Sequence, residues 1–243
     1  MKKWLTMMAS LSLAAAVGVT ACSKKEEANT VASTAESVET QEVPGRDEII
    51  QEEDVEPVDI GQADDQGLYK NETIGFEIQL PKSWYIMNVE EMDAMMEANT
   101  ANNPAAQTML PYLTQLVVAY DQDNATEGVG INTIHILLQE PTEYQDAKSL
   151  MSREKENMEM SKEIMGTASA LFEVSDLEEK TISGKTYYIL SNRFTGANGE
   201  STSSDMYCTQ LEDGTFLEMS FSYKDEAGKK AFEDAVSSIK HTK

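Results

Sequence analysis

The stretch Ile74-Gly75-Phe76-Glu77-Ile78-Gln79-Leu80-Pro81 decides how the rest of the folded chain is interpreted. Its apolar residues occupy every second position, with glycine, glutamate and glutamine between them. Alternation with a period of two is typical of a β-strand with one buried and one solvent-facing side, and proline ends such a strand. The folded part of the chain is therefore expected to contain a half-buried sheet.

Comparable apolar patterns predict more strands downstream. The predicted strands cover residues 116–120, 131–138, 172–181, 185–194, 206–211 and 217–223. Ser183-Gly184 and Asp213-Gly214 separate neighbouring strands and predict tight hairpin turns. The strand at 131–138 is apolar on both sides, which indicates that both faces of the sheet are covered.

Helical patterns lie on either side of these strands. Asn88 and Glu91 form a predicted capping box before a short helix, and Asp225 begins the last helix. A further helix start is predicted at Asn103-Pro104. The longest helix is expected to open at Pro141 and to bury residues on or near one face, namely Tyr144, Ala147, Leu150, Met151, Met158 and Met165. The sequence therefore predicts an α+β domain: an antiparallel-rich β-sheet with helices packed on both faces.

The N-terminus carries a different signal. Lys2 and Lys3 precede an uncharged apolar run that ends in Val19-Thr20-Ala21-Cys22, the pattern of a secretory signal peptide. These last four residues resemble the lipobox of bacterial lipoproteins. The resemblance implies that residues 1–21 are cleaved and that Cys22 becomes an acylated N-terminus, with a diacylglyceryl thioether and an N-acyl chain such as palmitate. The protein would then be lipid-anchored on the extracytoplasmic face of the cell membrane. The alternative is an ordinary signal peptide with a chance cysteine.

Charge limits the possible partners. The chain has 43 acidic against 19 basic residues, a net charge of −24. A negative electrostatic field disfavours binding to nucleic acid, which proteins bind through Lys and Arg. It attracts cations or basic partners. Residues 22–66 are acidic, contain no aromatic residue and are expected to form a disordered linker, or tether. Residues 67–243 have the composition of one folded domain.

The domain also resembles a known family. Phe76-x-Ile78-x-Leu80-Pro81-x-x-Trp84, the strand-rich second half and a terminal helix that ends in Ser238-Ile239 are similar to the PsbP-like superfamily. The resemblance covers about residues 67–243 and implies an α/β/α sandwich. Its members act mostly as accessory or assembly proteins, which implies a non-catalytic role here. PsbP docks largely through lysines, whereas this domain is acidic.

Candidate site residues are few. Asp121, Asp123 and Glu127 resemble the opening of a calcium loop, although its glycine and closing glutamate are missing. Of the 14 methionines, several crowd two helices, where they fill the core, line an adaptable groove or hold Cu(I). Cys208 is expected to be a small buried residue, His135 a residue of a sheet face, and His241 part of a frayed terminus.

These observations favour a non-enzymatic, lipid-anchored accessory module that binds an envelope protein. The sequence calls for no cofactor, and its two histidines do not suggest a catalytic set. The alternatives are a lipoprotein that binds a small ligand or a cation (Ca²⁺ or copper) and, third, an enzyme of unknown class.

Overall fold

The structure is a computed structural model that describes residues 59–100, 112–122, 132–141, 144, 146–165, 172–196 and 199–243. Within these residues the chain forms two sheets, and every strand pairing is antiparallel. The large sheet has the strand order β4-β5-β6-β11-β10-β9-β7, and β8 also pairs with β9. The small sheet has the order β1-β2-β3-β12.

The strands and helices have the following bounds. The large sheet consists of β4 (Tyr85–Ile86), β5 (Leu113–Tyr120), β6 (Thr133–Gln139), β7 (Phe172–Val174), β8 (Glu178–Ile182), β9 (Lys185–Thr195), β10 (Ser201–Gln210) and β11 (Phe216–Tyr223). The small sheet consists of β1 (Gln62–Ala63), β2 (Leu68–Asn71), β3 (Phe76–Gln79) and β12 (Lys240–His241). The helices are α2 (Val89–Thr100), α4 (Ala147–Met165) and α5 (Glu226–Ser237).

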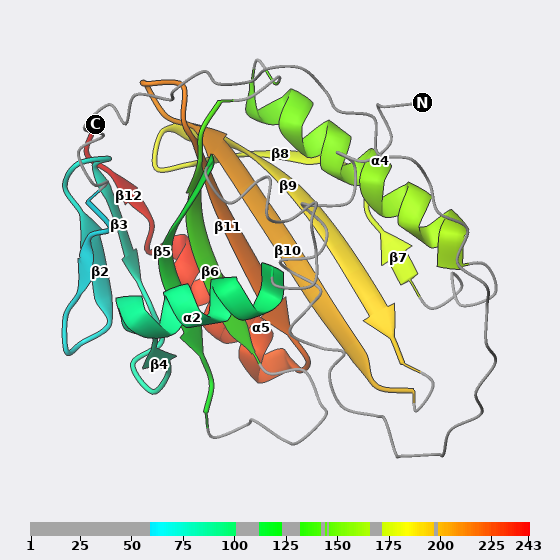
Figure 1. Cartoon of the computed structure of the whole chain (residues 1–243), viewed down its shortest axis with the longest axis horizontal. Helices are drawn as coiled ribbons and strands as arrows, with labels where there is room; N and C mark the ends of the chain where they lie inside the picture. The colour runs from blue at the N-terminus through cyan, green and yellow to red at the C-terminus, as the bar shows by residue number, and fades with distance from the viewer. Residues whose placement is uncertain are drawn as a thin grey trace, which may run out of the picture.

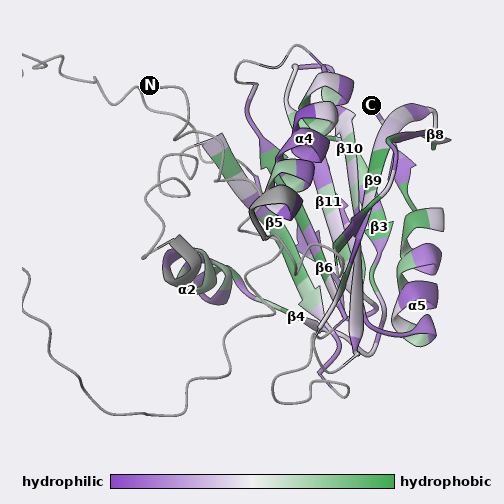
Figure 2. Cartoon of the chain, turned by 90° about the vertical axis from the view of Figure 1, so that its right-hand side faces the viewer, coloured by the Kyte–Doolittle hydropathy of each residue, from purple (hydrophilic) through white to green (hydrophobic). Residues whose placement is uncertain are grey.

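The elements form layers about the large sheet (Figure 1). Seen from the side, α2 and α4 lie on one side of this sheet and α5 lies on the other (Figure 2). The small sheet shares its core with α5, because buried residues of β2 and β3 belong to the same apolar cluster as those of α5. The predicted α+β class with helices on both faces is confirmed, with a second small sheet that the sequence did not separate.

The α5 side holds the main apolar core. Phe76, Ile78 and Leu80, the residues of the alternating opening stretch, are all fully buried there. The ring of Phe221 on β11 lies 4.2 Å from that of Phe232 on α5, and Tyr207 on β10 contacts both rings edge to face. Aromatic residues therefore join the two layers.

Two of the predicted helix starts are confirmed. Glu91 N–H donates to Asn88 Oδ1 and Asn88 N–H donates to Glu91 Oε2, both at 3.0 Å, which is a complete capping box. Asp225 caps α5 by accepting the Gly228 N–H at 2.7 Å. These caps satisfy N–H groups that have no partner within their helices.

The start of α4 was predicted too early. The helix begins at Ala147, not at Pro141, because Asp146 Oδ1 accepts the Ser149 N–H at 2.7 Å and so acts as the cap. The predicted helix start at Asn103-Pro104 and residues 1–58, which include Cys22, lie outside the described residues. β1 falls within the range that the sequence assigns to the linker.

Two further expectations were wrong. The strand expected at 172–181 is split into β7 and β8, because residues 175–177 lie opposite only two residues of β9, between the pairs Val174–Asn192 and Glu178–Ile189. His241 is not frayed: it pairs with Phe76 in β12, and its Nε2 lies 2.7 Å from the Tyr187 hydroxyl. Among the described residues, no helix is long and apolar enough to cross a membrane.

Candidate functional site

The large sheet presents a second, polar surface toward α2 and α4, which we call the polar face. The strand register defines it, because residues opposite each other on neighbouring strands share a face. Cys208 pairs with Glu218 and Met206 with Ser220 between β10 and β11, and Glu218 pairs with Leu137 and Ser220 with His135 between β11 and β6. The polar side chains of this face include Gln115, Thr133, His135, Gln139, Asn192, Ser204, Cys208, Glu218, Ser220 and Ser222.

The polar face is covered, although its composition suggests contact with solvent. Thr133, Gln139 and Ser204 are buried, and Ser220, Ser222 and His135 are half-buried. Serine and glutamate alternate with apolar residues along β11, a pattern that by itself favours a solvent-facing side of the sheet. The cover provided by neighbouring elements turns this wet side into an enclosed polar surface, where each polar group needs a partner.

Helix α4 covers the part of this face that carries Cys208. Its residues Ala147, Leu150, Met151 and Met158 form an apolar cluster with Leu190, Cys208 and Phe216 of the sheet. Glu154 lies in the middle of that apolar stripe and is only 5% exposed, as is Asn157 one turn further. Two buried polar residues with a spacing of three therefore interrupt the buried side of the helix.

The rotation of α4 shows where Asn157 lies. Successive residues turn by about 100° around a helix, so Lys155 and Asn157 flank Glu154 on opposite sides. Lys155 pairs with Asp176, which lies between the edge strands β7 and β8. Asn157 is therefore on the flank that faces the middle of the sheet, and Ser161, one turn on, donates to its backbone carbonyl at 3.0 Å.

Several buried oxygen atoms in this region lack a hydrogen-bond donor. They are Gln115 Oε1 on β5, Asn157 Oδ1 on α4 and Glu218 Oε1 on β11. All three are acceptors. An acceptor that is shielded from water and has no donor costs about 1–3 kcal/mol. Two buried side-chain nitrogen atoms on the α5 side, Asn132 Nδ2 and His241 Nδ1, also lack a partner. The polar face differs in that these three unsatisfied atoms are all oxygen acceptors.

The electrostatics of the region follow from burial and like charge. Burial, and to a lesser extent the nearby carboxylate of Glu154, together raise the pKa of Glu218 to about 8. Burial also raises the pKa of the Cys208 thiol well above its usual value, with smaller contributions from Glu218 and Glu154. Cys208 is therefore a protonated, inert thiol at neutral pH, as expected for a small buried residue.

The histidines do not complete a catalytic arrangement with Cys208. His135 is on β6 and Cys208 on β10, with β11 between them, so their backbones are separated by two strand spacings, about 9–10 Å. His241 contacts Phe76 and Tyr187 on the α5 side. Burial lowers the pKa of both histidines to about 4, so both are neutral at pH 7.

The predicted calcium residues are only partly described. Asp121 follows β5 and is buried, and its N–H donates to the Asn132 carbonyl at 3.0 Å. Asp123 and Glu127 lie outside the described residues. Among the residues that are described, no three His, Cys, Asp or Glu side chains come close enough together to hold a metal ion.

The methionines have divided roles. Met151 and Met158 are buried in the apolar cluster that contains Cys208, and Met158 Sδ accepts a weak hydrogen bond from Asn192 at 3.9 Å. These two residues fill the core beneath α4. Met95 and Met96 of α2 are only half-buried, and α2 lies on the same side of the sheet as α4 (Figure 2).

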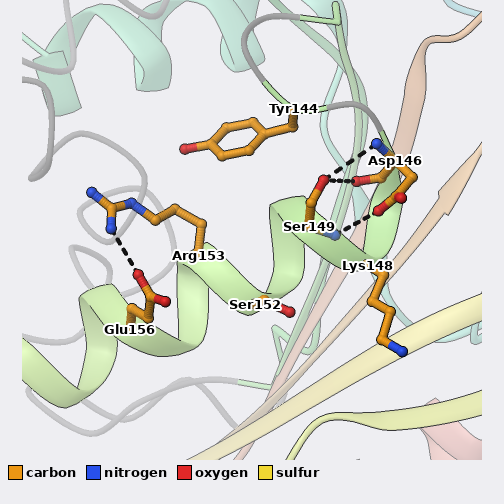
Figure 3. A pocket seen from close by; sticks show the side chains of 7 residues that line it. All are labelled: Tyr144, Asp146, Lys148, Ser149, Ser152, Arg153 and Glu156. Carbon is orange, nitrogen blue, oxygen red and sulfur yellow. Dashed lines mark hydrogen bonds and ion pairs between the residues drawn. The ribbon is translucent and has the colours of Figure 1, made fainter.

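A shallow pocket of about 500 Å³ lies on the outer side of α4, where Figure 3 shows its lining. Its charged groups already have partners: Arg153 binds Glu156 at 2.7 Å, Asp146 caps the helix, and Lys148 lies 6.0 Å from the ring of Tyr188. The pocket therefore offers fewer unused hydrogen-bonding groups than the polar face does.

The residues that mark the polar face were not among the sequence-predicted site residues. Glu218 alternates with apolar residues along its strand, and nothing in a single strand shows which helix covers its side chain. A signal was present in α4, because Glu154 and Asn157 interrupt the stripe formed by Leu150, Met151 and Met158. Polar residues in the buried stripe of a helix indicate a buried polar site.

A scan against models of protein families finds no match, and a search of curated proteins finds none. Among solved structures, the chain is similar to the solution structure of cyanobacterial PsbP (CyanoP) from Synechocystis sp. PCC 6803. The identity is 17% and the TM-score 0.44, over 72% of this chain and 91% of that one.

The chain is also similar to the crystal structure of LpqN, which is involved in cell envelope biogenesis of Mycobacterium tuberculosis. Here the identity is 13% and the TM-score 0.44, over 69% of this chain and 83% of that one. At such identities the likeness concerns the fold alone, and neither protein's role is transferred to this chain.

Proposed function

We propose that this chain is a lipid-anchored accessory protein of the cell envelope, and that its folded domain binds another envelope protein without catalysing a reaction. Acylation of Cys22 would hold the domain at the extracytoplasmic face of the membrane, on an acidic linker. Several acyl chains on one residue anchor a protein stably, whereas one chain does so only marginally.

The contrast between the two faces of the large sheet carries the proposal. The α5 side is closed by an aromatic core, whereas the side of α2 and α4 combines half-buried methionines with polar groups that lack donors. A binding surface of this kind combines adaptable apolar contacts with a few unsatisfied polar groups. The net charge of −24 favours a partner that presents a basic surface.

A non-catalytic role is supported by the state of the reactive groups. The raised pKa of the Cys208 thiol removes its nucleophilic form, and His135 is too far along the sheet to act as its base. Small-ligand binding is a second candidate function. It is favoured by the unsatisfied acceptors of the polar face.

Site-specific photo-cross-linking in cells that make the full chain tests the docking surface. A cross-linker at Met95 of α2 should give a discrete adduct with an envelope protein. A cross-linker at the exposed Glu233 of α5 is the matched control and should give none. Equal adducts from both positions, or from Glu233 alone, would contradict docking on this side.

The anchor has its own test. Cys22→Ser should give a protein that is unprocessed or released from the membrane. Mass spectrometry of the mature wild-type chain should show acyl chains on Cys22. A mature N-terminus at another, unmodified residue would refute the lipoprotein assignment.

A further inference from the structure

We propose that β8 is a docking edge of the large sheet, which accepts a basic, extended segment of a partner protein as an added antiparallel strand. The segment continues the sheet beyond β9 and β8 through backbone hydrogen bonds. The proposal goes beyond the function proposed above, because it uses neither the polar face nor α2.

The first argument is that β8 is an open edge. It lies at the outside of the large sheet, beside the first part of β9 (Figure 1). Its strand partner among the described residues is β9 alone, with five consecutive residue pairs and no bulge. The first four residues of β8 are exposed, and only Ile182 is buried. By comparison, β1, β4 and β12 end the two sheets elsewhere with two residues each. An unpaired edge of this kind is a template for another strand.

The second argument is the direction of the backbone groups. The turn between β8 and β9 consists of residues 183–184, both with positive φ. In such a two-residue hairpin the flanking pair, here Ile182 and Lys185, exchanges both backbone hydrogen bonds, and every second pair repeats this. The N–H and C=O groups of Glu179 and Thr181 therefore point away from β9. Among the described residues no backbone group of another element pairs with them, so they are available to an added strand.

The third argument is charge. Residues 172–182, which include β7 and β8, contain four acidic residues and one basic residue. Asp176 is paired with Lys155, but Glu178 and Glu179 form no ion pair with Lys or Arg in the described part of the chain. Adjacent residues of a strand point to opposite faces of the sheet. A segment with two adjacent basic residues therefore places one of them opposite each glutamate.

Lys180 limits which segments fit the edge. A lysine on an edge strand is one device by which proteins prevent unspecific strand pairing. A uniformly basic segment would place a like charge opposite Lys180, whereas a threonine at that position would not. The expected segment therefore has two adjacent basic residues among uncharged residues with high β-propensity, such as Thr and Val. The backbone hydrogen bonds supply the affinity, and the charged side chains select the segment.

Fluorescence anisotropy tests the proposal with a labelled, end-capped peptide of the sequence Thr-Val-Thr-Lys-Lys-Val-Thr, titrated with the purified full chain. In the proposed antiparallel register its first lysine lies opposite Glu179 and its second opposite Glu178. The wild type should give saturable 1:1 binding. The same peptide with glutamate in place of both lysines should not bind, because it meets like charges.

Methylation of single backbone nitrogens separates strand addition from general attraction to an acidic protein. The N–H of the first lysine points toward β8 in this register, and the N–H of the second points away from it. N-methylation of the first lysine should weaken binding by about tenfold or more, because it removes a hydrogen bond and blocks the approach of the strands. The same change at the second lysine is the matched control and should have a much smaller effect. Equal effects of the two methyl groups would overturn the proposal.

Variants of the chain test the same edge. Thr181→Pro removes an N–H that points away from β9 and leaves the hydrogen bonds between β8 and β9 intact, so it should fold and weaken peptide binding by about tenfold or more. Glu178→Lys should weaken binding by about threefold or more, because it replaces attraction by repulsion. Glu212→Lys makes the same charge change in the exposed turn after β10 and should have a much smaller effect.

Circular dichroism of each variant confirms folding. An absence of saturable peptide binding, an unchanged affinity of a folded Thr181→Pro variant, or equal weakening by Glu178→Lys and Glu212→Lys would overturn the proposal. The titration needs only the purified chain and a peptide, so its result is independent of whether cross-linking from Met95 identifies an envelope protein. The two proposals can therefore fail separately.

Discussion

The two faces of the large sheet use the same strands for different purposes. On β11, Leu217, Met219 and Phe221 point into the aromatic core beneath α5, while Glu218 and Ser220 point toward the side of α4. The α5 side combines full burial with ring contacts that join two layers. The polar face combines partial burial with acceptors that lack donors. The comparison predicts that the α5 side contributes most of the stability and that the polar face is the side available for binding.

The largest expected difference is between two phenylalanines of β11. Phe221→Ala removes a ring that packs against Tyr207 and Phe232 and should destabilise the domain by about 3–5 kcal/mol. Phe216→Ala removes an equally buried ring at the end of the polar face, where no aromatic contact is described, and should cost less. Urea unfolding measures the loss in the free energy of unfolding for each variant. An equal or larger loss for Phe216→Ala would contradict the assignment of stability to the α5 side.

The stability of the α5 side could largely be anticipated from the sequence. The alternation at Phe76, Ile78 and Leu80 identifies buried positions, because a strand with one covered face repeats with a period of two. The capping residues Asn88 and Asp225 acted as predicted, since an N-cap is a local interaction between residues two or three positions apart.

The polar face could not be anticipated in the same way. Glu218 acquires its properties from α4, whose Glu154 is 64 positions away in the sequence. His241 was misassigned for a related reason, since its position depends on Tyr187 of β9 and on pairing with β3. Contacts between segments that are distant in the sequence determine the burial and the partners of Glu218 and His241. The residue pattern of a single segment does not reveal such contacts.

The next largest effect is the dependence of stability on pH that Glu218 causes. Its pKa is about 8 in the folded chain, against 4.5 as its ordinary value, so the folded state holds this proton more tightly than the unfolded state does. The contribution of this proton to the free energy of unfolding is fully present below about pH 4.5 and is lost as the pH rises through 8. Glu218→Gln should remove this slope, which is at most about 1.4 kcal/mol per pH unit.

Urea unfolding of wild type and Glu218→Gln between pH 5 and 9 measures the difference. The groups that face Glu218 are Glu154 on α4, Cys208 on β10 and, in the next row of β6, His135. Glu212→Gln, in the exposed turn after β10, is the matched control and should keep the wild-type slope. A Glu218→Gln variant with that same slope would show that Glu218 ionises normally.

A smaller effect is expected on the opposite side of the sheet. Tyr187→Phe removes the hydroxyl that lies 2.7 Å from His241 Nε2, while the ring stays in the core. The loss of one neutral hydrogen bond should cost about 0.5–1.5 kcal/mol. Thermal unfolding measures it. An unchanged midpoint would indicate that the bond does not help to hold β12 against the large sheet.

The smallest effect is predicted for Ser220, next to Glu218 on the polar face. Its hydroxyl forms no hydrogen bond with another described residue, and its side chain is half-buried between His135 and Met206. Ser220→Ala should change the free energy of unfolding by less than about 0.5 kcal/mol, because no partner is left unsatisfied. If the polar face is a binding surface, Ser220→Trp, which adds a large side chain to it, should reduce cross-linking from Met95. Ser220→Ala should leave the cross-linking unchanged. A Ser220→Ala variant that unfolds as easily as Phe221→Ala would mean that the polar face also stabilises the fold, and the division between the two faces would not hold.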